Sequence, residues 1–302
     1  MKKFLLILLP LVLPLALGAQ TLPFLYNPTD ARSMALGGAG VALEADAWAA
    51  DANLAAAALS AKTFTVGLAY DRWAPQLLPD NRLSMGGWYR TGSLAFGLSG
   101  KGSFAPQAEG VGPAGQPLES FSPRDLSLAL GVAWTPVPGL AFSATARIVS
   151  SALDANTTGT AFCADLALQY ASGPVRAGIS AANLGAPIRY GEKSYTLPAI
   201  VRGGAAYTNP WVDATLETAY LAQAGLTATV GVEGRPLAQA GAQGSWLALR
   251  AAYHYGPADR GLPSFGSCGI GLSFSGLAID LAVLFASPVL GGSLCAGLSY
   301  AF

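Results

Sequence analysis

Four arginines and four acidic residues stand at alternate positions of otherwise apolar segments. They are Arg147, Arg176, Arg202, Arg250, Asp165, Asp213, Glu217 and Asp280. Charges in such surroundings normally find partners within the protein, and Arg202 and Glu217 are placed to pair across adjacent strands. We therefore predict internal ion pairs. The alternative is that Arg147 or Arg250 uses its planar donor fork to hold the carboxylate of a ligand.

The sequence offers little for catalysis or metal binding. His254 is the only histidine, and no G-x-S-x-G motif occurs. A nucleophilic site needs a base beside its nucleophile and a third group that orients the base. The three cysteines, Cys163, Cys268 and Cys295, lack metal-ligand spacing. We predict no enzyme activity, no metal and no cofactor, and we interpret His254 as an interfacial residue at the rim of a strand.

Composition indicates a membrane protein. Charged residues make up 11% of the 302 residues and the net charge is zero, whereas soluble domains carry roughly 25% charged residues. Beyond the N-terminus, no segment has the roughly 18 uninterrupted apolar residues of a membrane helix. An apolar chain without such a segment is typical of a transmembrane β-barrel. No basic patch points to nucleic acid, so we exclude that partner.

The first residues resemble an export signal. Met1-Lys2-Lys3 is a positive segment, residues 4–17 are apolar, and Gly18-Ala19 supplies small residues before Gln20. This three-part pattern predicts a signal peptide over residues 1–19. No cysteine follows the apolar segment, so a lipid-anchored protein is not indicated.

From residue 62 onward, fourteen segments alternate in polarity and are separated by turn residues. They are residues 62–70, 82–90, 93–101, 124–134, 140–150, 160–170, 175–183, 199–207, 211–220, 226–234, 245–255, 264–274, 277–285 and 292–302. Segments of about 9–11 residues span a bilayer when tilted. Short turns alternate with longer loops, as in outer-membrane barrels. Connections 221–225 and 235–244 reverse that order, so an error in the strand count is expected there.

The two faces of these segments suit a barrel in lipid. One face is apolar and often ends in an aromatic residue, while the other holds small residues and nearly all the charges. We predict an all-β fold, a closed antiparallel barrel of about 14 strands over residues 61–302. In the last strand, Leu294, Leu298, Tyr300 and Phe302 face lipid. Tyr300 and Phe302 form the expected assembly signal for the barrel assembly machinery.

Residues 20–60 lack this alternation and are rich in Ala and Gly. They are apolar enough to need burial, and small residues on the inner face leave room for them. We predict a hatch folded into the lumen, partly as short helices. Met34, Leu36 and Trp48 are the hatch residues expected to hold the apolar tail of a ligand.

Several segments of the chain resemble a known family. The resemblance rests on the sequences at 31–42 (with Gly-Gly-Ala-Gly-Val-Ala), 46–47, 53–55, 180–188, 197–198 and 202–207. These are similar to the start of PorV/PorQ-type outer-membrane proteins and to their "NLG…LP…R-G-AY" sequence. The more distant FadL-type long-chain fatty acid transporters share the start. Leu54 stands where the family usually has proline.

The resemblance implies a plugged 14-stranded barrel in the outer membrane of a diderm bacterium. It implies two different activities. FadL-type relatives let hydrophobic molecules cross the outer membrane through a side opening, whereas PorV-type relatives handle exported client proteins in type IX secretion. Residues 102–123 are Gly/Pro-rich and only modestly apolar, which suits a docking face poorly. We therefore favour passive transport of a hydrophobic small molecule, with a secreted client protein as the alternative partner.

Overall fold

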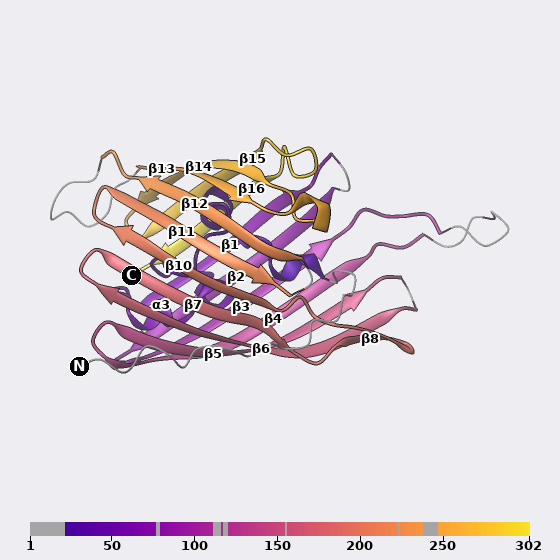
Figure 1. Ribbon diagram of the computed structural model, residues 1–302, viewed down its shortest axis with the longest axis horizontal. Helices are drawn as coiled ribbons and strands as arrows, with labels where there is room; N and C mark the ends of the chain where they lie inside the picture. Colours follow the sequence, from indigo (N-terminus) through magenta and orange to yellow (C-terminus); the bar gives the residue numbers. More distant parts are fainter. Residues whose placement is uncertain are drawn as a thin grey trace.

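The computed structural model describes residues 22–302 apart from 77–78, 111–115, 117–119, 155, 223 and 238–246. The predicted signal peptide lies outside the described residues. Figure 1 shows an elongated barrel whose strands run obliquely along its length, with the chain's C-terminus at one end. Within the described residues, no helix is both long and apolar enough to cross a membrane.

Fourteen strands of the described chain form one closed antiparallel barrel, which confirms the predicted fold. They are β1 (Phe64–Trp73), β2 (Asp80–Thr91), β3 (Leu94–Phe104), β4 (Arg124–Val137), β5 (Leu140–Ala152), β6 (Thr158–Ser172), β7 (Val175–Gly185), β10 (Ile200–Thr208), β11 (Val212–Leu221), β12 (Gly225–Gly234), β13 (Leu247–Tyr255), β14 (Phe265–Phe274), β15 (Leu277–Phe285) and β16 (Leu294–Ala301). β8 (Ile188–Tyr190) and β9 (Lys193–Tyr195) form a separate hairpin in the connection between β7 and β10.

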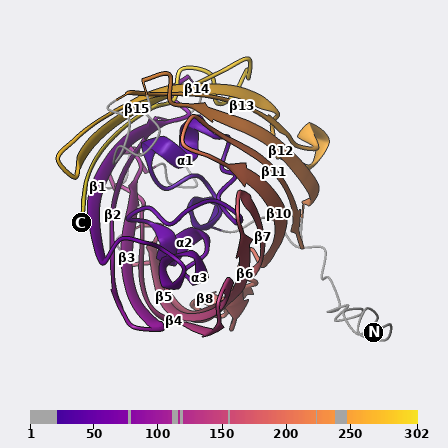
Figure 2. The same ribbon diagram turned by 90° about the vertical axis from the view of Figure 1, so that its left-hand side faces the viewer.

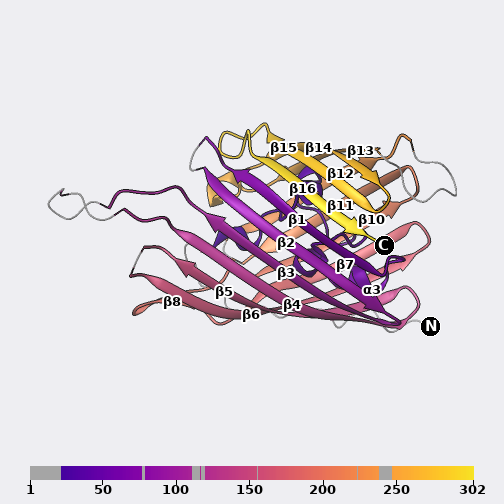
Figure 3. The same ribbon diagram turned by 180° about the vertical axis from the view of Figure 1, so that it is seen from behind.

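The first and last strands close the barrel. β1 and β16 lie side by side (Figure 3) and pair from Thr65 opposite Ala301 to Arg72 opposite Leu294. The carbonyl of Phe302 accepts hydrogen bonds from the N–H groups of Thr63 and Phe64, at 2.7 and 2.9 Å. Closure leaves no free sheet edge, which a barrel in lipid requires.

The strand count is correct where an error was expected. β11, β12 and β13 are consecutive neighbours in the sheet. The connection between β11 and β12 is short, and the connection between β12 and β13 is long. The rule that long loops gather at one end therefore has a local exception in this barrel.

The outer face of the barrel is apolar along its length. Exposed side chains include Leu68 on β1, Leu130 on β4, Phe162 on β6 and Leu216 on β11, each more than half exposed. Such a surface in water would cause aggregation, whereas hydrocarbon is its natural solvent. The outer face therefore indicates a barrel surrounded by lipid.

Residues 22–60 lie inside the barrel, as Figure 2 shows from the end with the short turns. They form η1 (Pro23–Leu25) and three short helices, α1 (Ala31–Ala35), α2 (Ala49–Ala52) and α3 (Ala55–Ala58). α1 packs against β13 to β16, while α2 and α3 pack against the opposite wall, mainly β2 to β6. We call residues 22–60 the hatch.

The alanines of α2 and α3 favour helix and are small enough to approach the wall closely. The wall has glycine where the hatch backbone touches it. At Gly178 on β7, an added Cβ would lie only 1.9 Å from the carbonyl oxygen of Val41, and at Gly86 on β2 it would lie 2.5 Å from that of Ala47. Hatch and wall therefore fit each other closely.

Candidate functional site

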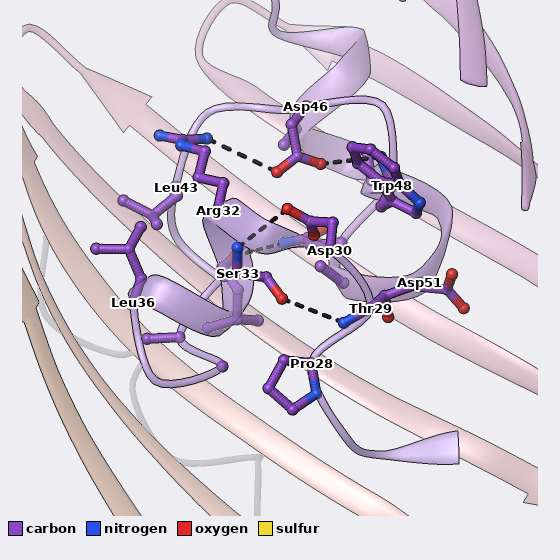
Figure 4. Close-up of a pocket in the computed structure, with 18 of the residues that line it drawn as sticks. Pro28, Thr29, Asp30, Arg32, Ser33, Leu36, Leu43, Asp46, Trp48 and Asp51 are labelled. Atoms are coloured by element: carbon purple, nitrogen blue, oxygen red, sulfur yellow. Dashed lines mark hydrogen bonds and ion pairs between the residues drawn. The ribbon is translucent and has the colours of Figure 1, made fainter. Parts of the chain in front are cut away.

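Arg32 connects the hatch to the wall. Its Nε donates to Glu233 Oε2 at 2.9 Å, and Nη2 lies 3.5 Å from Asp213 Oδ2. Figure 4 shows the guanidinium directed toward Asp46 of the hatch, with Nη1 3.8 Å from Asp46 Oδ2. Asp30 caps α1 by accepting a hydrogen bond from the N–H of Ser33 at 3.0 Å, which fixes the helix that carries Arg32.

A second set of ion pairs fastens α2. Arg147 on β5 donates to Asp51 Oδ1 at 2.8 Å and to Asp165 Oδ2 at 2.9 Å. Lys101 Nζ on β3 lies 3.6 Å from Asp51 Oδ1. Arg147 and Asp51 are both almost fully buried. Removing one partner of such a buried pair is strongly destabilising, because it leaves an uncompensated charge.

The carboxyl groups of the hatch respond to these surroundings in opposite ways. Burial alone would raise the pKa of Asp51, but Lys101 and Arg147 outweigh burial and lower this pKa to about 2. Burial, reinforced by the Asp46 carboxylate, raises the pKa of Asp30. Asp51 therefore stays ionised at neutral pH and holds the hatch to the wall through its ion pairs, whereas Asp30 serves mainly as the N-cap of α1.

The residues predicted to form internal ion pairs all do so in the structure. Arg202 Nε lies 3.6 Å from Glu217 Oε1, Arg176 Nη2 lies 2.5 Å from Glu44 Oε1, and Arg250 Nη1 donates to Asp280 Oδ1 at 2.5 Å. Asp165 pairs with Arg147, and Asp213 pairs with Arg32 and Arg235. Several of their partners are hatch residues, whose positions the strand pattern does not predict.

The residues predicted to hold a ligand are placed differently. Arg147 and Arg250 are buried and already engaged by carboxylates of the protein: Arg250 Nε also donates to Glu233 at 2.6 Å. Their guanidinium groups are therefore committed to the wall and hatch. Met34 is fully buried in an apolar cluster with wall residues of β14 to β16. Leu36 and Trp48 line a space of about 60 Å³ within the hatch, which is too small for an organic ligand.

A larger cavity lies between the hatch and the end of the barrel that carries most of the longer loops. We call it the outer cavity; its volume is about 440 Å³, within the roughly 300–1,000 Å³ of small-molecule sites. Its apolar lining includes Phe24, Tyr26, Trp73, Leu221 and Phe265. None of the five residues predicted to bind a ligand is among the described residues that line it.

The polar side chains of the outer cavity are mostly paired. Arg202 and Glu217 both line it. His254 faces this cavity and not the membrane interface, which corrects the prediction for this residue. Its Nδ1 forms a 2.8 Å hydrogen bond with Thr229 Oγ1, and its ring stacks on Phe265 with centroids 4.8 Å apart. By the alternation of β13, His254 lies on the inner face, between the outward-facing Tyr253 and Tyr255.

Within the described residues, no group of three His, Cys, Asp or Glu side chains could hold a metal ion. The partners of His254 given above are a threonine and a phenylalanine, which do not form a triad.

No family model and no curated protein sequence matches the chain. Solved structures do. The Ralstonia pickettii toluene transporter TbuX superposes with a TM-score of 0.65 at 13% identity, over 91% of this chain and 97% of TbuX. The Pseudomonas putida toluene transporter TodX gives 0.64 at 13%, over 89% and 96%. A Pseudomonas aeruginosa FadL homologue gives 0.53 at 13%, over 90% and 95%.

The chain has the FadL-type barrel fold. At this identity the likeness establishes the fold alone. It agrees with the FadL part of the resemblance noted in the sequence, whereas nothing in these comparisons supports the PorV/PorQ part. The neighbours named above are two toluene transporters and a FadL homologue.

Proposed function

We propose that this protein is an outer-membrane channel for the passive transport of hydrophobic small molecules. The outer cavity carries the proposal: it is ligand-sized, largely apolar, and lies directly above the hatch. The apolar outer face supports a place in the membrane, and the names of TbuX and TodX support a hydrophobic cargo.

The alternative function, binding of secreted client proteins, has less support. A barrel that only presents a docking surface needs no ligand-sized space in its lumen, yet the outer cavity occupies about 440 Å³. The named structural neighbours are also not secretion proteins. Capture of an exported protein by the loops, without uptake of any small molecule, would return us to this alternative.

Transport can be tested by filling the cavity. Leu221 at the end of β11 is buried and lines the outer cavity, whereas its neighbour Tyr220 faces outward and is 41% exposed. Leu221→Trp should block the cavity, and Tyr220→Trp should leave it open. We would express both variants in the outer membrane of a host with low uptake and measure the entry of radiolabelled naphthalene.

We expect wild type and Tyr220→Trp to accelerate entry and Leu221→Trp to lose that acceleration. Equal uptake by cells with and without the wild-type protein would refute transport of this class of molecule. Equal uptake by the two variants would show that the route avoids the outer cavity. Heat-modifiable migration of each variant in gels verifies that the barrels are folded.

A further inference from the structure

The charges that line the outer cavity are unbalanced. Three carboxylates, Asp80, Asp125 and Glu217, line it, and Arg202 is the only lysine or arginine among the described lining residues. His254 adds a ring whose Nδ1 is already hydrogen-bonded. A carboxylate ligand entering this space would meet more negative than positive charge.

The guanidinium of Arg202 is also compensated. Glu217 Oε1 lies 3.6 Å from Arg202 Nε, and Nη2 donates to the carbonyl of Tyr26 at 3.4 Å. Glu217 is itself held in place, because its Oε2 accepts hydrogen bonds from the N–H groups of Gly40 and Val41, both at 2.9 Å. The hatch backbone therefore fixes the carboxylate that neutralises Arg202.

The other two carboxylates lie at the ends of β2 and β4, on either side of β3. Ser103 on β3 is directly opposite Asp125 and donates a hydrogen bond to Asp80 Oδ2. The second oxygen, Asp80 Oδ1, is buried and has no hydrogen-bond partner among the described residues. Among the described residues, this part of the cavity lining offers an acceptor and no cationic donor.

Resting on the proposed transport function, we propose that the outer cavity selects uncharged apolar molecules and rejects carboxylates, with Glu217 as the specificity-determining residue. An ion that leaves water for an apolar cavity needs a compensating charge. Here Arg202, the one lysine or arginine among the described lining residues, is already paired with Glu217, and Asp80 and Asp125 add repulsion. An uncharged apolar ligand is not repelled by these charges, and its binding is stabilised by contact with Phe24, Trp73 and Phe265.

The test compares two probes with the same ring system, naphthalene and 2-naphthoate, by equilibrium dialysis at pH 7 against the full-length protein in lipid nanodiscs. Empty nanodiscs correct for partition into lipid. Wild type should bind naphthalene at least about tenfold more tightly than 2-naphthoate. Equal affinity, or tighter binding of 2-naphthoate, overturns the selectivity.

Glu217→Gln should reverse part of the preference. The glutamine oxygen can still accept from Gly40 and Val41, but Arg202 loses its counter-charge. We expect 2-naphthoate to bind about tenfold more tightly than to wild type, with naphthalene unchanged. Adding Arg202→Met should abolish this gain. The matched control is Glu44→Gln, which frees Arg176 outside the outer cavity and should change neither affinity.

Asp125→Asn provides an independent variant if Glu217→Gln fails to fold. It removes repulsion without touching the hatch and should also improve 2-naphthoate binding. An absence of any gain in every folded variant overturns the role of these charges. If wild type binds neither probe, the outer cavity is not a ligand site, and the transport proposal is refuted as well. If it binds both equally while naphthalene uptake persists, only the selectivity is refuted.

Discussion

The contact between Gly178 and the hatch allows a sharp prediction about what holds the hatch in the lumen. A Cβ at position 178 would lie 1.9 Å from the carbonyl oxygen of Val41, whereas real Cβ contacts are essentially never shorter than 3.0 Å. In Gly178→Ala, the carbonyl must therefore move away by at least 1.1 Å. The same oxygen accepts a 2.7 Å hydrogen bond from Asn53 Nδ2, which this movement would break or stretch.

The cost can be estimated from these two effects. Overpacking costs about 1–3 kcal/mol, and loss of a hydrogen bond adds about 0.5–1.5 kcal/mol. A combined penalty of about 1.5–4.5 kcal/mol lowers the equilibrium constant in favour of the seated hatch by at least about tenfold. The barrel strands themselves need not change, because Gly178 lies on the inner face and its clash is with the hatch.

Limited proteolysis of the folded barrel and conductance in planar bilayers measure the effect. Gly178→Ala should expose residues near Val41 to protease and raise the conductance. The control is Gly203→Ala on the neighbouring strand β10, where an added Cβ has no atom within 4 Å. If Gly178→Ala is as well protected and as poorly conducting as Gly203→Ala, the hatch is not seated as described, and the argument fails.

Three further predictions concern the ends and charges of the molecule. Phe302→Ala should slow folding into the membrane in heat-modifiability time courses, because it removes an aromatic contact with Phe64 at 5.5 Å worth about 0.5–1.5 kcal/mol; unchanged kinetics would count against Phe302 as an assembly signal. Arg147→Met should lower stability in denaturant titrations by about 3–5 kcal/mol, because it leaves the Asp165 carboxylate without its cation and leaves Asp51 with Lys101 alone. The corresponding change at Arg176, whose partner Glu44 is 56% exposed, should cost at most about 1 kcal/mol; similar losses would contradict this ranking. Because the pKa of Asp51 is lowered from 3.8 to about 2 in the folded protein, its stabilisation is present above pH 4 and is lost as the pH falls toward 2. Protection of the hatch from pepsin should therefore fall over this range in wild type and fall less in Asp51→Asn; parallel curves would exclude the role of Asp51.

The sequence predicted the wall of the barrel well because a strand is a local pattern. Alternation over nine or ten residues identifies both the strand and its inner face, and β15 begins and ends where the pattern predicted it. The thickness of the bilayer sets the length of each strand, and turn residues mark where strands end, so together they limit the number of strands. An error in the strand count was expected only around β12, because the loop lengths there reverse the usual order. The pairing of β11, β12 and β13 as neighbouring strands shows that the count is correct despite those lengths.

The site was predicted less well because it is made of distant residues. The outer cavity combines Phe24 of the hatch with Trp73 and Phe265 of two separate strands. No residue spacing in the sequence indicates that these three side chains come together. Arg32, which connects the hatch to Glu233 and Asp213, carried a usable signal, because a lone arginine in an apolar, alanine-rich segment inside a barrel needs acidic partners on the wall.

The arrangement of charge explains why the candidate ligand site differs from the one that the sequence predicted. The sequence predicted that Arg147 or Arg250 anchors a ligand carboxylate, but the protein supplies its own carboxylates to both. Asp51 and Asp165 pair with Arg147, and Glu233 and Asp280 pair with Arg250. Those charges serve to hold the hatch and wall together. The outer cavity above the hatch is largely apolar, and Arg202, the one lysine or arginine among its described lining residues, is already neutralised by Glu217. Fastening the hatch with ion pairs thus uses up the guanidinium groups that a carboxylate ligand would need, and the remaining cavity suits an uncharged one.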